Sequence, residues 1–269
     1  MLLIKNKGLR MICGAIETFN LLTLKLWWKN PSRARAFSGK IFRDYMSLVG
    51  RDRWTSRSIS EILPNAKDSR IVLEHLPGDG IFNPIDELAY LALITRYLEP
   101  KKVFEIGTFR GRTALNFALN SPADCIVFTM DLPLDDRESL SNRVNAADAA
   151  IIKASETGLY YRGRPEAGKI KQLYGDSLVF DFKPYAASVD LVFVDGAHDY
   201  RCASSDTRNA FEMVVEGGFI VWHDFSNYGD YNDVTRAVLD LIPSGKVIQI
   251  ENSQLAVYRK EAGDRLRSH

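Results

Sequence analysis

From residue 85 to residue 259 the chain alternates between two patterns of hydrophobic and polar positions. Short runs rich in β-branched and aromatic residues predict strands at 102–106, 125–131, 170–175, 189–195 and 219–224. Segments with apolar residues three and four positions apart predict helices at 85–99, 110–120, 141–158, 200–218 and 232–241. Two more strand-like runs, 246–250 and 254–259, fit a closing hairpin.

A strict alternation of strands and helices is typical of an α/β sheet covered by helices on both faces. The run at 189–195 is almost wholly apolar, as expected for a parallel strand buried on both sides. We therefore predict a doubly wound, Rossmann-like, mostly parallel seven-stranded sheet with an antiparallel terminal strand. This domain is expected to span residues 76–269, and residues 1–75 are expected to form a helical N-terminal extension.

Polar residues or glycines stand at the end of every predicted parallel strand. They are Glu105 with Gly107, Asp131, Asp176, Asp195, and His223 with Asp224. In doubly wound sheets ligands bind at the carboxyl ends of the strands, near the point where the strand order reverses. Aspartate and glycine also favour turns for local reasons, but a carboxylate at each of these ends favours a binding site.

The first of these turns indicates the kind of ligand. It reads EIGTFRG, in which Gly107 permits a tight turn and Gly111 opens the next helix without a side chain. The full G-x-G-x-x-G of dinucleotide sites is missing, and the acidic Glu105 disfavours a phosphate. Asp131, twenty residues after Gly111, is suited to accept hydrogen bonds from ribose hydroxyls. A cofactor with an adenosine and a positive charge but no phosphate fits these features, and S-adenosylmethionine has this composition.

Five segments in order, FEIGTFRGRTAL, MDLP, YGDS, VDGAHDY and GGFIVWHD, resemble the class I S-adenosylmethionine-dependent methyltransferases. The first is similar to the form found in catechol-type, caffeoyl-coenzyme-A-type and related small-molecule O-methyltransferases. The resemblance covers about residues 82–260 and implies methyl transfer to a small molecule, chiefly at a hydroxyl. It also implies a cofactor site formed by Glu105, Gly107, Thr108, Gly111, Asp131, Asp176, Ser177 and Asp195. Asp131 is expected on the ribose, and Asp176 with Ser177 near the adenine.

His198 and Asp195 are the candidate catalytic residues. Methyl transfer to oxygen is an in-line displacement that requires an aligned acceptor and removal of its proton. His198 follows Asp195 by three residues, where the catechol-type relatives have a lysine base, and histidine titrates near neutrality. Alternatively, His198 only caps the helix that begins near Tyr200. Asp199, Tyr200 and Asp206 are interpreted as helix-start and surface residues.

Asp195, His223 and Asp224 are the candidate ligands of a divalent metal ion. His223 and Asp224 follow the glycine pair 217–218 at the distance where those relatives carry Asp-Asn or Asp-Asp ligands. A histidine in the set departs from that pattern, since magnesium prefers oxygen ligands. It favours manganese, iron or zinc, or a site without metal, in which His223 is hydrogen-bonded within the core.

Composition and charge indicate the environment of the protein and argue against a nucleic-acid partner. The 269 residues are 46% hydrophobic and 26% charged, as in ordinary globular proteins. Three cysteines without a C-x-x-C spacing suggest a reducing, cytoplasmic environment. Residues 1–58 hold 12 Lys/Arg against 3 Asp/Glu, whereas the remainder holds 23 against 31. Because the predicted catalytic body is mildly acidic, we expect no nucleic-acid partner.

The segment 11–28 has an apolar helical face, but Glu17 and Lys25 interrupt it and its length is marginal for spanning a bilayer. Two interpretations remain open. The helix packs on the body or on a second subunit of a homo-oligomer, or residues 11–35 contact a membrane surface peripherally.

Two other functions also remain open. A nicotinamide-dependent oxidoreductase has a similar sheet, although the incomplete glycine fingerprint and Glu105 argue against it. A non-catalytic scaffold with a methyltransferase-like fold is the second alternative, although no motif is visibly broken.

Overall fold

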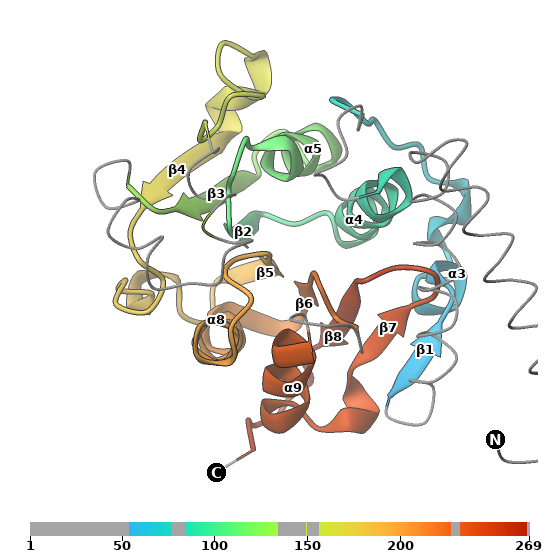
Figure 1. Ribbon diagram of the computed structural model, residues 1–269. Helices are drawn as coiled ribbons and strands as arrows, with labels where there is room; N and C mark the ends of the chain where they lie inside the picture. The colour runs from blue at the N-terminus through green and yellow to red at the C-terminus, as the bar shows by residue number, and fades with distance from the viewer. Residues whose placement is uncertain (1–53, 77–83, 134–148, 150–155, 227–231, 268–269) are drawn as a thin grey trace, which may run out of the picture. The chain divides into compact units, whose positions relative to one another are not determined.

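The computed structural model describes residues 54–76, 84–133, 149, 156–226 and 232–267 (Figure 1). Contacts divide the chain into two compact units, Met1–Val49 and Gly50–His269, and all the described residues belong to the second unit. The segment 11–35 and most of the predicted helix at 141–158 lie outside the described residues.

The second unit is built on one eight-stranded sheet with the strand order β1-β7-β8-β6-β5-β2-β3-β4 (Figure 1). The strands are β1 Thr55–Arg57, β2 Lys102–Ile106, β3 Ile126–Asp131, β4 Ile170–Tyr174, β5 Val189–Val194, β6 Val214–Trp222, β7 Ile248–Ile250 and β8 Ala256–Arg259. All neighbouring strands pair in parallel except β8, which is antiparallel to both β6 and β7. The predicted Rossmann-like, mostly parallel sheet with an antiparallel terminal strand is therefore confirmed.

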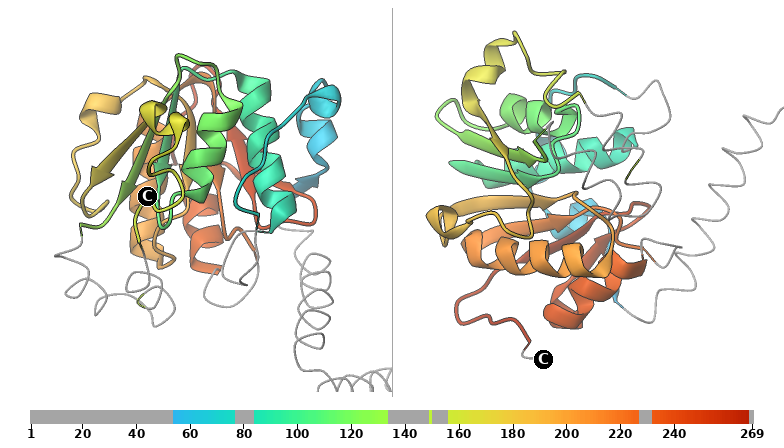
Figure 2. Two further views of the ribbon diagram at one scale, coloured as in Figure 1. Left: turned by 90° about the horizontal axis from the view of Figure 1, so that it is seen from above. Right: turned by 60° about the vertical axis from the view of Figure 1, so that its left-hand side comes forward.

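Helices cover both faces of the sheet (Figure 2). The α-helices are α3 Ile59–Ile62, α4 Ile85–Leu98, α5 Arg112–Asn120, α8 Tyr200–Met213 and α9 Asn232–Leu241, and short 3-10 turns lie at Ala66–Asp68, Pro165–Lys169, Lys183–Tyr185 and Ser244–Lys246. Because side chains alternate along a strand, Val103 of β2 packs in the core cluster under α4 and α5. Its neighbour Phe104 packs in the opposite cluster with residues of α8 and α9. This two-sided burial explains the nearly continuous apolar runs of the central strands.

The described residues form one strand more than the seven that the sequence predicted. The eighth strand, β1, comes from the segment assigned to the N-terminal extension, and it pairs in parallel with β7. The adjacent Trp54 is buried; its Nε1 donates to Gln249 Oε1 at 2.8 Å, and its ring meets Phe225 edge-on. Three residues are too few to show a strand periodicity in the sequence, so β1 could not be predicted from its pattern. Its pairing with β7 and the contacts of Trp54 hold it in the sheet.

The end of the predicted helix 200–218 is a second difference. Helix α8 ends at Met213, and Gly217 and Gly218, expected to close the helix, lie inside β6. A Cβ on Gly218 would lie 2.7 Å from the carbonyl oxygen of Asp190 in β5, and Gly217 has φ +83°. Gly218 therefore allows the close approach of two strands at an irregularity in their register, and Gly217 provides the left-handed backbone conformation beside it.

Within the described part of the chain, no helix is both long enough and apolar enough to cross a membrane.

Candidate active site

The strand order reverses between β2 and β5, and this is where the predicted site residues gather. The chain runs from β2 outward to β3 and β4 on one side, and from β5 to β6 on the other. Gly107, just after β2, has φ +104°, and a Cβ there would lie 1.9 Å from the carbonyl oxygen of Asp195. The Asp195 N–H in turn donates to the Ile106 carbonyl at 2.8 Å. Only glycine at position 107 permits this junction, which fixes Asp195 beside the first turn.

Two of the predicted cofactor residues lie below the rim of the sheet, inside a chain of side-chain hydrogen bonds. Glu105 is buried and accepts a 2.5 Å hydrogen bond from Thr129 Oγ1, which also contacts Thr108 Oγ1 at 2.7 Å. Gln172 Nε2 donates to Thr108 Oγ1 at 3.1 Å. Burial raises the pKa of Glu105 well above its usual value, and the Thr129 hydrogen bond offsets only part of this effect. The charge of Glu105 is thus a weaker argument against a phosphate ligand than the sequence suggested.

Gly111 makes room for a tyrosine ring. It has φ +77°, and a Cβ there would lie 2.5 Å from the ring of Tyr161. The Tyr161 hydroxyl donates to Gln172 Oε1 at 2.5 Å. This hydrogen bond joins the ring to the hydrogen-bonded side chains below the rim of the sheet. In this structure Gly111 is thus required by packing within the protein as well as by its backbone conformation.

Asp131, Asp176 and Ser177 lie half-buried at the ends of the neighbouring strands β3 and β4. Asp131 accepts backbone hydrogen bonds from Phe109 and Leu132 at 2.9 and 2.8 Å. Asp176 Oδ1 accepts one from Leu178 at 2.9 Å. Backbone N–H groups therefore hold these carboxylates in place at the ends of the two strands.

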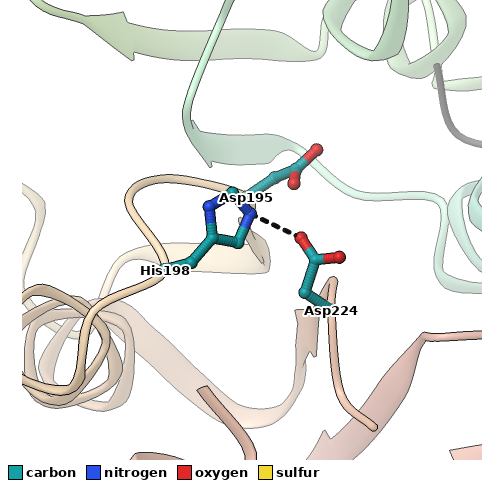
Figure 3. Close-up of side chains that lie close together, drawn as sticks. All are labelled: Asp195, His198 and Asp224. Carbon is teal, nitrogen blue, oxygen red and sulfur yellow. Dashed lines mark hydrogen bonds and ion pairs between the residues drawn. The ribbon is translucent and has the colours of Figure 1, made fainter. Parts of the chain in front are cut away.

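Asp195, His198 and Asp224 converge at the ends of β5 and β6, where one ligand atom from each lies within 4.8 Å of the others (Figure 3). His198 Nε2 is 2.7 Å from Asp224 Oδ2. Asp224 has φ +56°, an uncommon conformation for a non-glycine residue. The capping role considered for His198 belongs to Asp199, whose carboxylate accepts from the N–H groups of Arg201 and Cys202.

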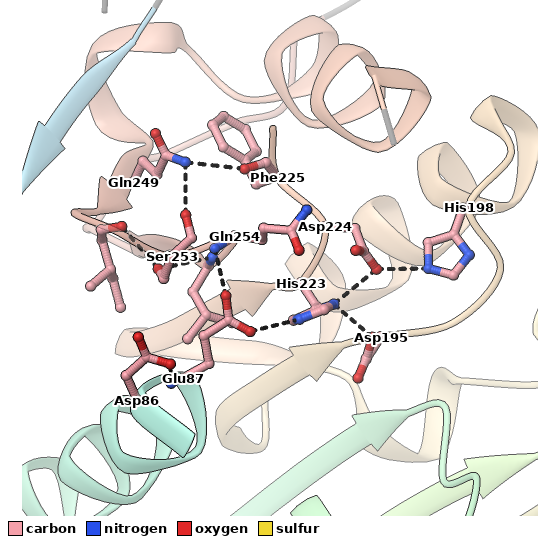
Figure 4. Close-up of polar contacts among 12 residues, drawn as sticks. Asp86, Glu87, Asp195, His198, His223, Asp224, Phe225, Gln249, Ser253 and Gln254 are labelled. Atoms are coloured by element: carbon pink, nitrogen blue, oxygen red, sulfur yellow. Dashed lines mark hydrogen bonds and ion pairs between the residues drawn. The ribbon is translucent and has the colours of Figure 1, made fainter. Parts of the chain in front are cut away.

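His223 lies under this cluster with both ring nitrogens facing carboxylates (Figure 4). Nδ1 is 2.8 Å from Asp224 Oδ2 and 3.3 Å from Asp195 Oδ1, and Nε2 is 3.0 Å from Glu87 Oε2. Burial disfavours a charged ring, but the carboxylates of Asp224 and Asp195 outweigh it and hold the pKa of His223 well above its usual value. Burial also acts to raise the pKa of Asp224, but His223 and His198 lower it below its usual range.

Two buried acids in and near the site were missed by the sequence analysis. Glu87 of α4 was not singled out, and Asp206 of α8 was interpreted as a surface residue; they are 2% and 1% exposed. The interpretation of Asp206 was wrong because this residue lies on the buried face of its helix, between Ala203 and Ala210. Helical spacing contains this signal: Asp206 is three positions from one buried alanine and four from the other.

Two of the donor separations among Asp195, His223 and Asp224 suit a common metal ion. Ligand atoms that bind one transition-metal ion at right angles lie about 3 Å apart, since each is about 2.1 Å from the ion. The separations around His223 Nδ1, 2.8 and 3.3 Å, match this value. An ion bound there would replace the proton on Nδ1. His198 Nε2 is close enough to belong to an alternative ligand set with Asp195 and Asp224.

Comparison with known proteins identifies the class. Residues 104–225 match a family model described as a methyltransferase domain. No curated protein matches the sequence. Similar solved structures include SAH-bound PaMTH1 from Podospora anserina, 13% identical with a TM-score of 0.48, covering 81% of this chain and 94% of that chain. Another is TomG from Streptomyces achromogenes, an O-methyltransferase of tomaymycin synthesis solved with SAM, 17% identical with a TM-score of 0.43, covering 81% and 96%.

The family match spans the glycine turn, the strand-end acids and the His198–Asp224 pair. It confirms the resemblance to the class I S-adenosylmethionine-dependent methyltransferases that was derived from the motifs. The solved structures share too little identity to add to this assignment, which depends on the family match and on the residues of the site.

Proposed function

We propose that this protein transfers the methyl group of S-adenosylmethionine to a hydroxyl oxygen of a small molecule, with His198 as the general base. The observation that carries the proposal is the 2.7 Å contact between His198 Nε2 and Asp224 Oδ2 at the strand-order reversal of a methyltransferase domain. A carboxylate that holds one ring nitrogen fixes the tautomer and orientation of an imidazole base.

The cofactor is proposed to lie along the ends of β2, β3 and β4. Asp131 accepts from the ribose hydroxyls, and Asp176 with Ser177 contacts the adenine; both carboxylates are already oriented by backbone N–H groups. Gly107 lets the methionine part approach the backbone beside Asp195. Glu105, Thr108 and Gly111 support this turn from below, as their burial indicates.

The chemical step needs one proton acceptor. When Nε2–H of His198 donates to Asp224, Nδ1 holds the lone pair that takes the hydroxyl proton. The acceptor oxygen attacks the methyl carbon as the carbon–sulfur bond breaks, and the bonding electrons pass to sulfur to give neutral S-adenosylhomocysteine. Asp195 lies beside this base and directs the acceptor.

The proposal includes a divalent ion held by Asp195, His223 and Asp224, whose donor separations fit one. When bound, such an ion lowers the pKa of an acceptor hydroxyl. A nitrogen in the set favours manganese, iron or zinc over magnesium.

The direct test is methyl transfer from labelled S-adenosylmethionine to a panel of phenols, catechols and aliphatic alcohols. We expect label on oxygen with wild-type protein and a large loss of turnover with His198→Ala, while S-adenosylhomocysteine still binds. Equal turnover of the two proteins would disprove the role of His198. Label on nitrogen or carbon instead of oxygen would disprove the proposed acceptor class.

A further inference from the structure

Glu87 is a buried acid from a helix that none of the recognised motifs includes. It lies at the start of α4, is 2% exposed, and uses both carboxylate oxygens (Figure 4). Oε1 accepts the backbone N–H of Gln254 at 2.7 Å, and Oε2 is 3.0 Å from His223 Nε2. Glu87 thus contacts two parts of the chain that are distant in sequence, 167 and 136 residues away.

The contact with Glu87 determines which nitrogen of His223 faces the site. A carboxylate has no proton to donate, so Nε2 must carry the hydrogen in this pair. Nδ1 is then the nitrogen that faces Asp195 and Asp224, at 3.3 and 2.8 Å. Without an ion Nδ1 also carries a hydrogen, because these carboxylates too can only accept. Metal-binding histidines commonly donate their other ring N–H to a carboxylate, which fixes the ring and makes the ligating nitrogen more basic.

We propose that Glu87 is a positioning residue that keeps the hydrogen on His223 Nε2, so that Nδ1 is the nitrogen that gives up its proton to bind a divalent ion beside Asp195 and Asp224. Gln254 lies in the turn between β7 and β8, and its backbone N–H donates to the Glu87 carboxylate and fixes its orientation. The site thereby depends on α4 and on the terminal hairpin, both outside the five segments that resemble the family. The inference assumes the metal site described under the proposed function.

Glu87→Gln tests this arrangement with almost no change of size. The amide oxygen can still accept from Gln254, but the amide NH2 would then face His223 Nε2 and donate to it. With Nε2 as an acceptor, the ring keeps its remaining hydrogen on Nδ1, which then has no lone pair for a metal. Asp86→Asn is the matched control: it neutralises the preceding acid of the same helix, whose carboxylate accepts the Glu87 backbone N–H.

The probe is cobalt(II) alone, titrated by its visible absorption, with S-adenosylhomocysteine binding measured calorimetrically on the same proteins. We expect Glu87→Gln to bind cobalt about 10- to 100-fold more weakly than wild type. Asp86→Asn should bind like wild type, and all three proteins should bind S-adenosylhomocysteine equally. If Glu87→Gln does not fold, Glu87→Asp replaces it, because withdrawing the carboxylate by one methylene must also weaken cobalt binding.

Equal cobalt affinity in wild type and Glu87→Gln overturns the inference. So does a wild-type protein that binds S-adenosylhomocysteine but no cobalt, and that result leaves methyl transfer itself untouched. Failure of the wild-type protein to bind S-adenosylhomocysteine would instead contradict the proposed function.

Discussion

Asp206 should make the protein less stable as the pH rises, and replacing it with asparagine should remove that dependence. The carboxyl group is 1% exposed and lies near the side chains of Ser177, Asp176 and Asp199. Burial raises the pKa of Asp206 from its usual 3.8 to about 7; Ser177 opposes the shift, and the carboxylates of Asp176 and Asp199 add to it.

The sign and size follow from proton linkage. Between pH 4 and 7 the folded protein keeps the Asp206 proton and the unfolded chain has lost it, so unfolding releases a proton and rising pH favours unfolding. Each pKa unit corresponds to about 1.4 kcal/mol, so the two units between pH 5 and 7 reduce the free energy of unfolding by roughly 2–3 kcal/mol. Asp206 is fully buried, so solvent screening does not reduce this value substantially.

Urea unfolding at pH 5 and pH 8, without cofactor, measures the effect for wild type and Asp206→Asn. The buried amide has its own desolvation cost, but that cost is the same at both pH values. The wild type should therefore lose about 2–3 kcal/mol more than Asp206→Asn between pH 5 and 8. Glu212→Gln, an exposed acid on the same helix, should behave like wild type. If wild type and Asp206→Asn lose equal stability, the reasoning about Asp206 is wrong.

Three further substitutions test other parts of the site. Gly107→Ala should lower the free energy of unfolding by about 3 kcal/mol or more, because its Cβ would collide with the Asp195 carbonyl; an unchanged thermal midpoint would contradict the packing described. His198→Ala should reduce kcat by about 10²- to 10⁴-fold with unchanged S-adenosylhomocysteine affinity, and parallel loss of both would point to a structural role. Asp131→Ala should weaken S-adenosylhomocysteine binding by about 10- to 100-fold in calorimetry, and unchanged affinity would remove Asp131 from the cofactor site.

Much of the sheet could be predicted because its central strands are buried on both faces and therefore stand out as apolar runs. Strands β2 to β5 appear within a residue of their predicted bounds. The prediction missed β1, whose three residues pair through the backbone with a strand near the other end of the chain. It also placed the end of α8 too late. Gly217 and Gly218 favour a helix end, but here Gly218 permits a close approach of two strands and Gly217 has a left-handed conformation inside β6.

The sequence likewise predicted which residues gather in the site, but not how all of them are oriented or buried. Position at strand ends sufficed to bring Asp195, His198, His223 and Asp224 together, because parallel strands end at one edge of the sheet. The orientation of His223 was not predictable from those motifs, since Glu87 reaches it across 136 residues of chain. Which side chains would be buried beneath the glycine turn depended on packing partners that no local pattern specifies.

The central claim is that the ends of β2, β3 and β4 bind S-adenosylmethionine rather than a nicotinamide dinucleotide. Calorimetric titration of the wild-type protein with S-adenosylhomocysteine and, separately, with NAD tests it most directly. We expect saturable binding of S-adenosylhomocysteine and none of NAD at the same concentrations. Tight binding of NAD without binding of S-adenosylhomocysteine would contradict it.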